Sequence, residues 1–164
     1  MNDSAIFSKV KTWDEINLWR ENLRKQKKKL VFTNGCFDIL HRGHVSYLIK
    51  ASQIGDALIV AINSDRSIKL LKGESRPVTQ EDDRALIMAC LEFIDAVVIF
   101  DSIRCDKLIR TVQPDIYVKA GDYDIETLNA SEKQALNDVN SDISFIPFSD
   151  GYSSTAIINK MNKT

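Results

Sequence analysis

The sequence predicts an α/β protein with a Rossmann-like, doubly wound sheet of five parallel strands and helices on both faces. Short apolar runs alternate with amphipathic stretches along the chain, which is typical of this class. The run Ala57–Ile62 is apolar throughout, as in a strand buried on both faces. Polar segments that contain glycine follow these runs directly, as at the carboxyl edge of such a sheet. At 164 residues, the chain is expected to form a single domain over residues 1–164.

The predicted strands are Leu30–Thr33, Ala57–Ile62, Ala96–Phe100, Ile116–Val118 and Ile143–Ile146. The predicted helices between and after them span about 44–55, 66–71, 80–93, 103–112, 125–139 and 153–162. Pro114 ends one of these helices, and Ser153 is expected to cap the last. Right-handed crossovers would then place helices on both faces of the sheet.

The first 28 residues are expected to form a helical extension that packs on this domain. Thr12-Trp13-Asp14-Glu15 has the form of a capping box and would begin a helix that runs to about Lys28. Apolar side chains recur in it at steps of three and four residues, at Trp13, Ile16, Trp19 and Leu23. This stripe either covers the protein's own core or forms an interface with a second copy.

Composition excludes several classes of function. A net charge of −1 gives no electrostatic case for binding nucleic acid. No apolar run is long enough for a membrane span, and the first residues lack the layout of a signal peptide. A cytoplasmic location is therefore expected. The three cysteines fit neither a disulfide framework nor a zinc pattern.

The most informative stretch is Phe32–His44, where the first predicted strand leads through Asn34-Gly35 into a helix. Both histidines of the chain, His41 and His44, lie here, three residues apart. At that spacing, two side chains at a helix start share one face. Backbone N–H groups at a helix N-terminus favour an anion, commonly phosphate. The stretch therefore predicts a nucleotide-phosphate site, with two ordinary loop histidines as the alternative.

Asn34–His44 resembles the signature of the cytidylyltransferase-like nucleotidyltransferases, which contains a His-x-Gly-His motif. Four later segments make the chain similar, more narrowly, to bacterial D-glycero-D-manno-heptose 1-phosphate adenylyltransferases. These segments are Ala61–Asp65, Lys72–Val78, Val118–Tyr123 and Asp150–Thr155. One departure concerns Ala120, where many heptose enzymes have glycine. Another is Phe148-Ser149-Asp150-Gly151, where the branch that uses glycerol 3-phosphate has Arg-Thr-Glu-Gly.

The resemblance implies adenylyl transfer from ATP to D-glycero-D-manno-heptose 1-phosphate, giving ADP-heptose and pyrophosphate for surface polysaccharide. Mg²⁺ is expected with ATP, to neutralise the triphosphate, and no metal-binding residue is assigned, although Mg²⁺, a nucleotide ribose and substrate hydroxyls are alternative ligands of Asp122. Because dimers are common in the family, a homodimer is expected. Many family members are fused to a sugar kinase, for which this chain is too short, so a separate kinase is expected. The alternatives are CTP or GTP as donor, another small phosphorylated sugar or alcohol as acceptor, or a non-catalytic nucleotide-binding module.

The resemblance also assigns site residues in three groups. The expected catalytic residues are His41, His44 and Lys72. The expected nucleotide-binding residues are Thr33, Asn34, Gly35, Phe37, His41, Gly43, His44, Gly121, Asp122, Tyr152, Ser153, Ser154 and Thr155. The expected substrate-binding residues are Asp38, Asn63, Asp65, Arg76, Arg84 and Lys119. For Asp38 the alternative is a brace within the loop, and for Lys72 and Arg76 a solvated cation.

Overall fold

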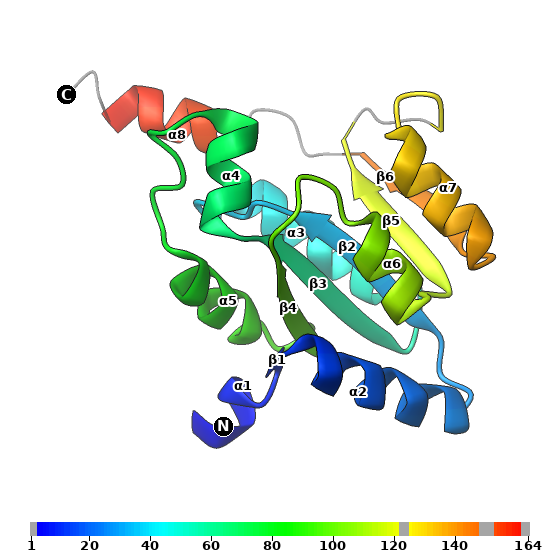
Figure 1. Cartoon of the computed structure of the whole chain (residues 1–164). Coiled ribbons are helices and arrows are strands. Elements are labelled where there is room, and N and C mark those ends of the chain that lie inside the picture. The colour runs from blue at the N-terminus through cyan, green and yellow to red at the C-terminus, as the bar shows by residue number, and fades with distance from the viewer. Residues whose placement is uncertain (1–2, 122–124, 148–152, 162–164) are drawn as a thin grey trace.

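The computed structural model describes residues 3–121, 125–147 and 153–161, and it is an α/β structure around one parallel sheet (Figure 1). The strands are β1 (Val10–Lys11), β2 (Leu30–Gly35), β3 (Ala57–Asn63), β4 (Ala96–Phe100), β5 (Ile116–Ala120) and β6 (Asp142–Ile146). Within the described residues they pair in the order β1-β4-β3-β2-β5-β6. The predicted class is therefore correct, but the predicted count of five strands is wrong because the sheet has six.

The additional strand is β1, which lies in the segment that was predicted to be a helical extension. Val10 pairs with Val97 and Lys11 with Val98 at the edge of the sheet. A pair of residues is too short to show any hydrophobic period, so the sequence pattern gives no signal for it. The helices α1 (Asp3–Phe7) and α2 (Trp13–Lys25) flank this strand, and α2 begins at the predicted capping box.

The remaining helices lie where they were predicted, although several are shorter. They are α3 (Arg42–Ser52), α4 (Asp65–Lys72), α5 (Glu81–Ala89), α6 (Asp106–Val112), α7 (Ala130–Asp138) and α8 (Ser154–Met161). The start of α7 shows why a predicted boundary moves. The Asn129 side chain accepts the Ser131 backbone N–H at 3.0 Å, so a local cap sets the first turn.

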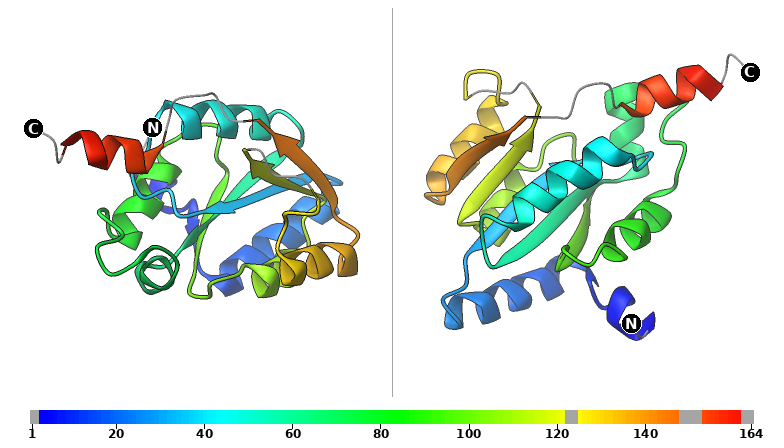
Figure 2. Two further views of the ribbon diagram at one scale, coloured as in Figure 1. Left: turned by 90° about the horizontal axis from the view of Figure 1, so that it is seen from above. Right: turned by 180° about the vertical axis from the view of Figure 1, so that it is seen from behind.

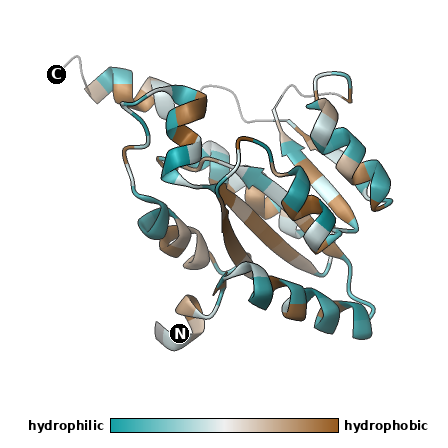
Figure 3. Ribbon diagram, viewed as in Figure 1, coloured by the Kyte–Doolittle hydropathy of each residue, from teal (hydrophilic) through white to brown (hydrophobic). Residues whose placement is uncertain are grey.

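The core has two halves, one on each face of the sheet, because neighbouring strand residues point to opposite faces. Leu30 and Phe32 of β2 pack with side chains of α2, α6 and α7. Val31, between them, packs with side chains of α3 and α5. Figure 2 shows the corresponding layers, with α3 on one face and α2, α6 and α7 on the other. In Figure 3 the central strands are hydrophobic and the outward surfaces of the helices hydrophilic.

The strand order creates a switch point between β2 and β5. From β2 the chain continues to β3 and β4 on one side, and then crosses to β5 and β6 on the other. Connections that leave neighbouring strands in opposite directions open a crevice at their carboxyl ends, where α/β sheets bind ligands. A ligand-binding site is therefore expected beside the last residues of β2 and β5.

Candidate functional site

A cavity of about 330 Å³ opens at this switch point. Seven of the predicted site residues line it, namely Asn34, Gly35, Phe37, His44, Asn63, Lys72 and Lys119. They come from the carboxyl ends of β2, β3 and β5 and from the N-terminus of α3 and the C-terminus of α4. The volume lies within the range of small-molecule pockets.

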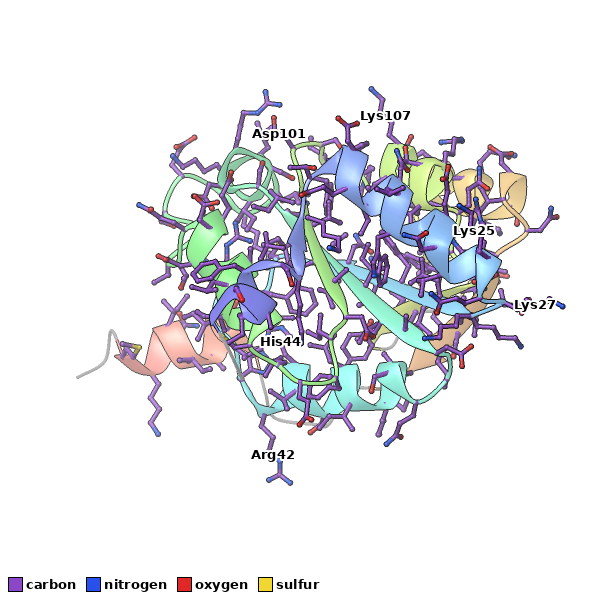
Figure 4. The ribbon with its side chains drawn as sticks, turned by 90° about the horizontal axis from the view of Figure 1, so that it is seen from below. Lys25, Lys27, Arg42, His44, Asp101 and Lys107 are labelled. Atoms are coloured by element: carbon purple, nitrogen blue, oxygen red, sulfur yellow. The ribbon has the colours of Figure 1, made fainter. Side chains whose placement is uncertain are left out.

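The two histidine rings stack on each other at the N-terminus of α3. Their centroids are 3.8 Å apart and their planes 18° from parallel. His41 is the N-cap of α3, and its Nδ1 accepts the His44 backbone N–H at 3.4 Å. In a neutral His41 ring the proton is therefore on Nε2. In Figure 4, His44 lies within the body of the molecule while Arg42 extends outward.

Both imidazoles are held towards the neutral form. Burial lowers the pKa of His41 below its ordinary value. Burial, with the charges of His41 and Lys72, lowers the pKa of His44 from 6.5 to about 4, against an opposing hydrogen bond to the Ile39 carbonyl. The Nδ1 of His44 is buried and has no hydrogen-bond partner among the described residues.

Phe37 shapes the wall beside this pair. Its backbone has a φ of 44°, which is unusual for a bulky residue, and its ring meets that of His44 edge-on at 5.1 Å between centroids. A side chain on Gly35 would place its Cβ only 3.0 Å from the Phe37 ring. The turn after β2 therefore needs glycine at position 35 if Phe37 is to pack in this way. Strained backbone of this kind gathers at ligand sites.

Lys119 is fixed on the other side of the switch point. Its Nζ donates to Asn34 Oδ1 and to the Tyr117 hydroxyl, each at 3.2 Å. The Tyr117 hydroxyl also donates to Asn34 Oδ1, at 2.8 Å. These bonds join the ends of β2 and β5 and hold an ammonium group in the cavity wall. Its charge suits a phosphate.

Lys72 and Asn63 complete the wall on the β3 side. Lys72 is the last residue of α4, which ends at Gly73 with a φ of 94°, a conformation that favours glycine. Asn63 is 4% exposed, and its amide donates to Ser67 Oγ at 2.8 Å. Lys72 is thus an exposed cation on the rim, whereas Asn63 is held in place.

Four predicted substrate residues lie outside the cavity and bind one another or the backbone. Asp38 is 3% exposed and accepts from Arg76 Nε at 2.5 Å and from the Val78 and Thr79 N–H groups. Burial alone would raise the pKa of Asp38, but these hydrogen bonds and the Arg76 charge lower it overall. The carboxylate thereby ties the loop after β2 to the loop after α4.

Arg84 makes a second tie of this kind. It is 1% exposed and donates to the Thr79 and Cys36 carbonyls and to Asp65 Oδ1. A guanidinium whose nitrogens are used in this way positions the loop after β2. We call these four side chains the frame behind the cavity, because they bind the protein itself and do not line the cavity. The frame consists of Asp38, Asp65, Arg76 and Arg84.

The other predicted nucleotide residues are spread around the same edge. Thr33 is fully buried, and its hydroxyl pairs with that of Tyr47, which donates to the Val118 carbonyl at 3.1 Å. Gly43 is buried in the first turn of α3, and Gly121 follows β5 with a φ of 106°. Asp122 and Tyr152 lie outside the described residues.

Helix α8 approaches the histidine loop through one contact. Ser154 Oγ donates to the Ile39 carbonyl at 3.2 Å, two residues before His41. Ser153 Oγ accepts the Ala156 N–H at 3.0 Å, so it makes the predicted capping bond. Thr155 is exposed. None of these three hydroxyl side chains lines the cavity.

Several lining residues were missed by the sequence reasoning. They are Cys36, Tyr47, Leu71, Ile103, Arg104, Ala120 and Glu132. Arg104 lies in the segment after β4, and Lys119 lies near the end of β5. The position of Arg104 after a strand could therefore have identified it as a site residue. Glu132 lies inside a helix and carries no such signal.

The described residues contain neither a metal-binding cluster nor a membrane span. No group of three or more His, Cys, Asp or Glu side chains there is placed to hold a metal ion. No described helix combines the length and the apolar character of a membrane span.

Comparison with known proteins gives a consistent set of relatives. Residues 32–160 match the family described as cytidylyltransferase-like. The bifunctional protein HldE of Nitratiruptor sp. is 47% identical over 152 residues, which are 93% of this chain and 32% of that protein. HldE of Aliarcobacter butzleri is 44% identical over 163 residues, 99% of this chain and 33% of the relative. The chain thus spans about a third of the length of these relatives.

Two solved structures are similar in fold. The first is a lipopolysaccharide core biosynthesis protein from Thermoplasma volcanium, with a TM-score of 0.61 and 27% identity over 77% of this chain and 99% of that one. The second is the pantoate-beta-alanine ligase of Francisella tularensis, with a TM-score of 0.63 over 94% of this chain and 78% of that one. At 19% identity, the second likeness shows the fold alone.

Proposed function

Because the chain belongs to the cytidylyltransferase-like family, we propose that it transfers an adenylyl group from ATP to D-glycero-D-manno-heptose 1-phosphate. The products are ADP-heptose and pyrophosphate, and the pathway is that of surface polysaccharide. The choice of sugar rests on the similarity to the HldE proteins and on the motif segments after β3, α4 and β5. The observation that carries the proposal is the histidine pair stacked at the N-terminus of α3. His44 of this pair lines the same cavity as Lys72 and Lys119, whereas His41 stacks on it from outside the cavity lining.

The reaction needs positioning and charge stabilisation rather than covalent catalysis by the protein. An oxygen of the sugar phosphate attacks the α-phosphorus in line, and the bond from that phosphorus to the β-phosphate oxygen breaks. The attacking oxygen is already ionised, so no general base is required. The imidazoles of His41 and His44, placed at the N-terminus of α3, stabilise the α-phosphate oxygens as charge develops there. Lys72 and Lys119 supply the positive charge.

We expect Mg²⁺ to enter with ATP, held by phosphate oxygens and water, since Mg²⁺ dehydrates reluctantly. Its role there is to neutralise the triphosphate. A homodimer also belongs to this proposal.

The deciding experiment measures pyrophosphate release with each of the four nucleoside triphosphates and heptose 1-phosphate as acceptor. Turnover is expected with ATP. Turnover only with CTP or GTP would show that the proposed donor is wrong. Turnover only with another phosphorylated alcohol would show that the proposed acceptor is wrong.

A variant separates an enzyme from a nucleotide-binding module. His44→Ala is expected to lower kcat by about a hundredfold or more, with a much smaller change in the Kd for ATP. Lys107→Ala, on the outer surface of α6, is the matched control and should leave both unchanged. Equal loss of kcat and of ATP affinity in His44→Ala would contradict the catalytic role.

A further inference from the structure

A second cavity of about 250 Å³ adjoins the first. Arg104, Lys119 and Glu132 line both cavities, so the two are continuous around these side chains. The rest of its wall comes from Thr127, Leu128 and Asn129, just before α7. This space extends from the phosphate-binding groups of the first cavity towards α6 and α7. It is polar, and the histidine pair takes no part in it.

Glu132 is an unusual group to find in that wall. It lies in the first turn of α7 and is 3% exposed. One oxygen, Oε1, accepts the Cys105 N–H at 3.2 Å and the Cys105 thiol at 3.3 Å. The other oxygen has no partner among the described residues, and none of the ion pairs found there includes Glu132. This oxygen is not among the fully buried unpaired atoms of the described residues, so it is accessible from the cavity as a hydrogen-bond acceptor.

Arg104 faces the same space from the loop between β4 and α6. Its side chain is exposed, and it makes no hydrogen bond or ion pair with the part of the chain that the structure describes. Lys119 is anchored to Asn34 and Tyr117, as described above. The second cavity thus combines two cationic donors with one carboxylate acceptor.

We propose that Glu132, Arg104 and Lys119 form the subsite for the hydroxyl-bearing part of a phosphorylated polyol acceptor. The free oxygen of Glu132 accepts from sugar hydroxyls, and Arg104 donates to the hydroxyl oxygens. The phosphate of the acceptor then lies towards Lys72 and the histidines, because its attacking oxygen must reach the α-phosphorus of ATP there. This inference rests on the proposed function, since it assigns the acceptor to the same site.

The subsite gives the enzyme a means of selecting its sugar. A buried group built to bond a hydroxyl rejects an analogue that lacks it, because the polar group is then left unpaired. A purely apolar wall discriminates far less. Glu132 is therefore a specificity-determining residue that acts on binding of the acceptor rather than on ATP.

The test compares Glu132→Gln and Arg104→Ala with the controls Glu92→Gln and Lys107→Ala, which change exposed side chains outside both cavities. Glutamine keeps a carbonyl oxygen for the Cys105 N–H, so folding should be preserved, and thermal unfolding checks this. Calorimetric titration measures the Kd for heptose 1-phosphate, for inorganic phosphate and for ATP.

Glu132→Gln is expected to weaken heptose 1-phosphate binding about tenfold or more. Arg104→Ala should weaken the same binding to a smaller extent. The Kd for ATP and, in Glu132→Gln, the Kd for inorganic phosphate should change by less than about twofold. The KM for the sugar should rise in parallel. An unchanged Kd for the sugar in Glu132→Gln, or an equal loss for ATP, overturns the inference.

The wild-type protein separates this outcome from failure of the proposed function. Wild-type turnover with unchanged sugar affinity in the variants refutes the subsite and leaves the reaction intact. Wild-type binding without turnover refutes the reaction, and the variant titrations still decide the subsite. If the wild type binds neither heptose 1-phosphate nor glycerol 3-phosphate, both proposals fail.

Discussion

At the scale of single residues, His44 makes the stability of the protein depend on pH. Its pKa is about 4 in the folded chain and near 6.5 when unfolded. Between these values the unfolded chain binds a proton that the folded chain does not, so stability is full above pH 6.5 and falls as the pH drops towards 4. From pH 7.5 to pH 5, His44 should account for a loss of about 2 kcal/mol.

Urea unfolding of the wild type and of His44→Gln at these two pH values measures that loss. The wild type should lose about 2 kcal/mol more than the variant, because carboxylates contribute equally to both. Equal losses would show that the His44 pKa is not lowered in the folded protein.

Asp38 provides a second prediction, on the frame behind the cavity. Asp38→Ala leaves the Arg76 guanidinium and two backbone N–H groups without their acceptor, so unfolding in urea should show a loss of about 3–5 kcal/mol. Asp138→Ala removes an exposed carboxylate paired with Arg110 and should change stability little. Similar effects in both variants would mean that Asp38 is not a structural brace.

The sequence predicts which residue types surround the site better than it predicts their tasks. Of the seven predicted residues that line the cavity, Asn34, Gly35, Asn63 and Lys119 lie at the carboxyl ends of strands, a position that the chain order reveals. Asp38 and Arg84 carry the same signal, yet their polar atoms bind the protein itself. Pairing of this kind depends on loops brought together in three dimensions, and no local pattern encodes it.

At the scale of elements, α2 offers a direct test of a cap that the sequence predicted. Thr12 and Glu15 bond each other's backbone N–H groups at 3.3 and 2.8 Å. Thr12→Ala should reduce the free energy of unfolding by about 1 kcal/mol because the Glu15 N–H loses its acceptor. Thr12→Ser keeps a hydroxyl and should lie within a few tenths of a kcal/mol of the wild type. A neutral alanine variant would show that α2 is held by packing alone.

Elements with a long apolar pattern were predictable, and those set by partners were not. The runs in β3 and β4 are buried almost throughout, so their composition identifies them. β1 consists of Val10 and Lys11, and it is a strand only because its backbone pairs with the edge of β4. The role of Glu132 could not be predicted from the sequence either, because it depends on where α7 packs against the start of α6.

At the scale of the whole molecule, the site joins segments from opposite ends of the chain. The contact from Ser154 to the Ile39 carbonyl spans 115 residues of sequence. Helix α8 buries none of its side chains, and in Figure 1 it lies at the periphery, beyond the carboxyl edge of the sheet. An element with so little burial opens readily, so its amides should exchange quickly in the absence of ligand.

ATP is expected to change this, because the proposed contacts of Ser154 and Thr155 with the nucleotide exist only in the bound state. Hydrogen exchange in α8 should slow by about tenfold or more at saturating ATP and Mg²⁺, together with exchange in the first turn of α3. Helix α2, on the opposite face of the sheet from α3, serves as the internal reference and should keep its rate. Protection confined to α3 would separate α8 from the nucleotide and leave the histidine pair as the whole of the phosphate site. Protection of both helices that disappears in Ser154→Ala would show that the two ends of the chain are coupled through the ligand, because that variant removes a hydroxyl and leaves the cavity lining intact.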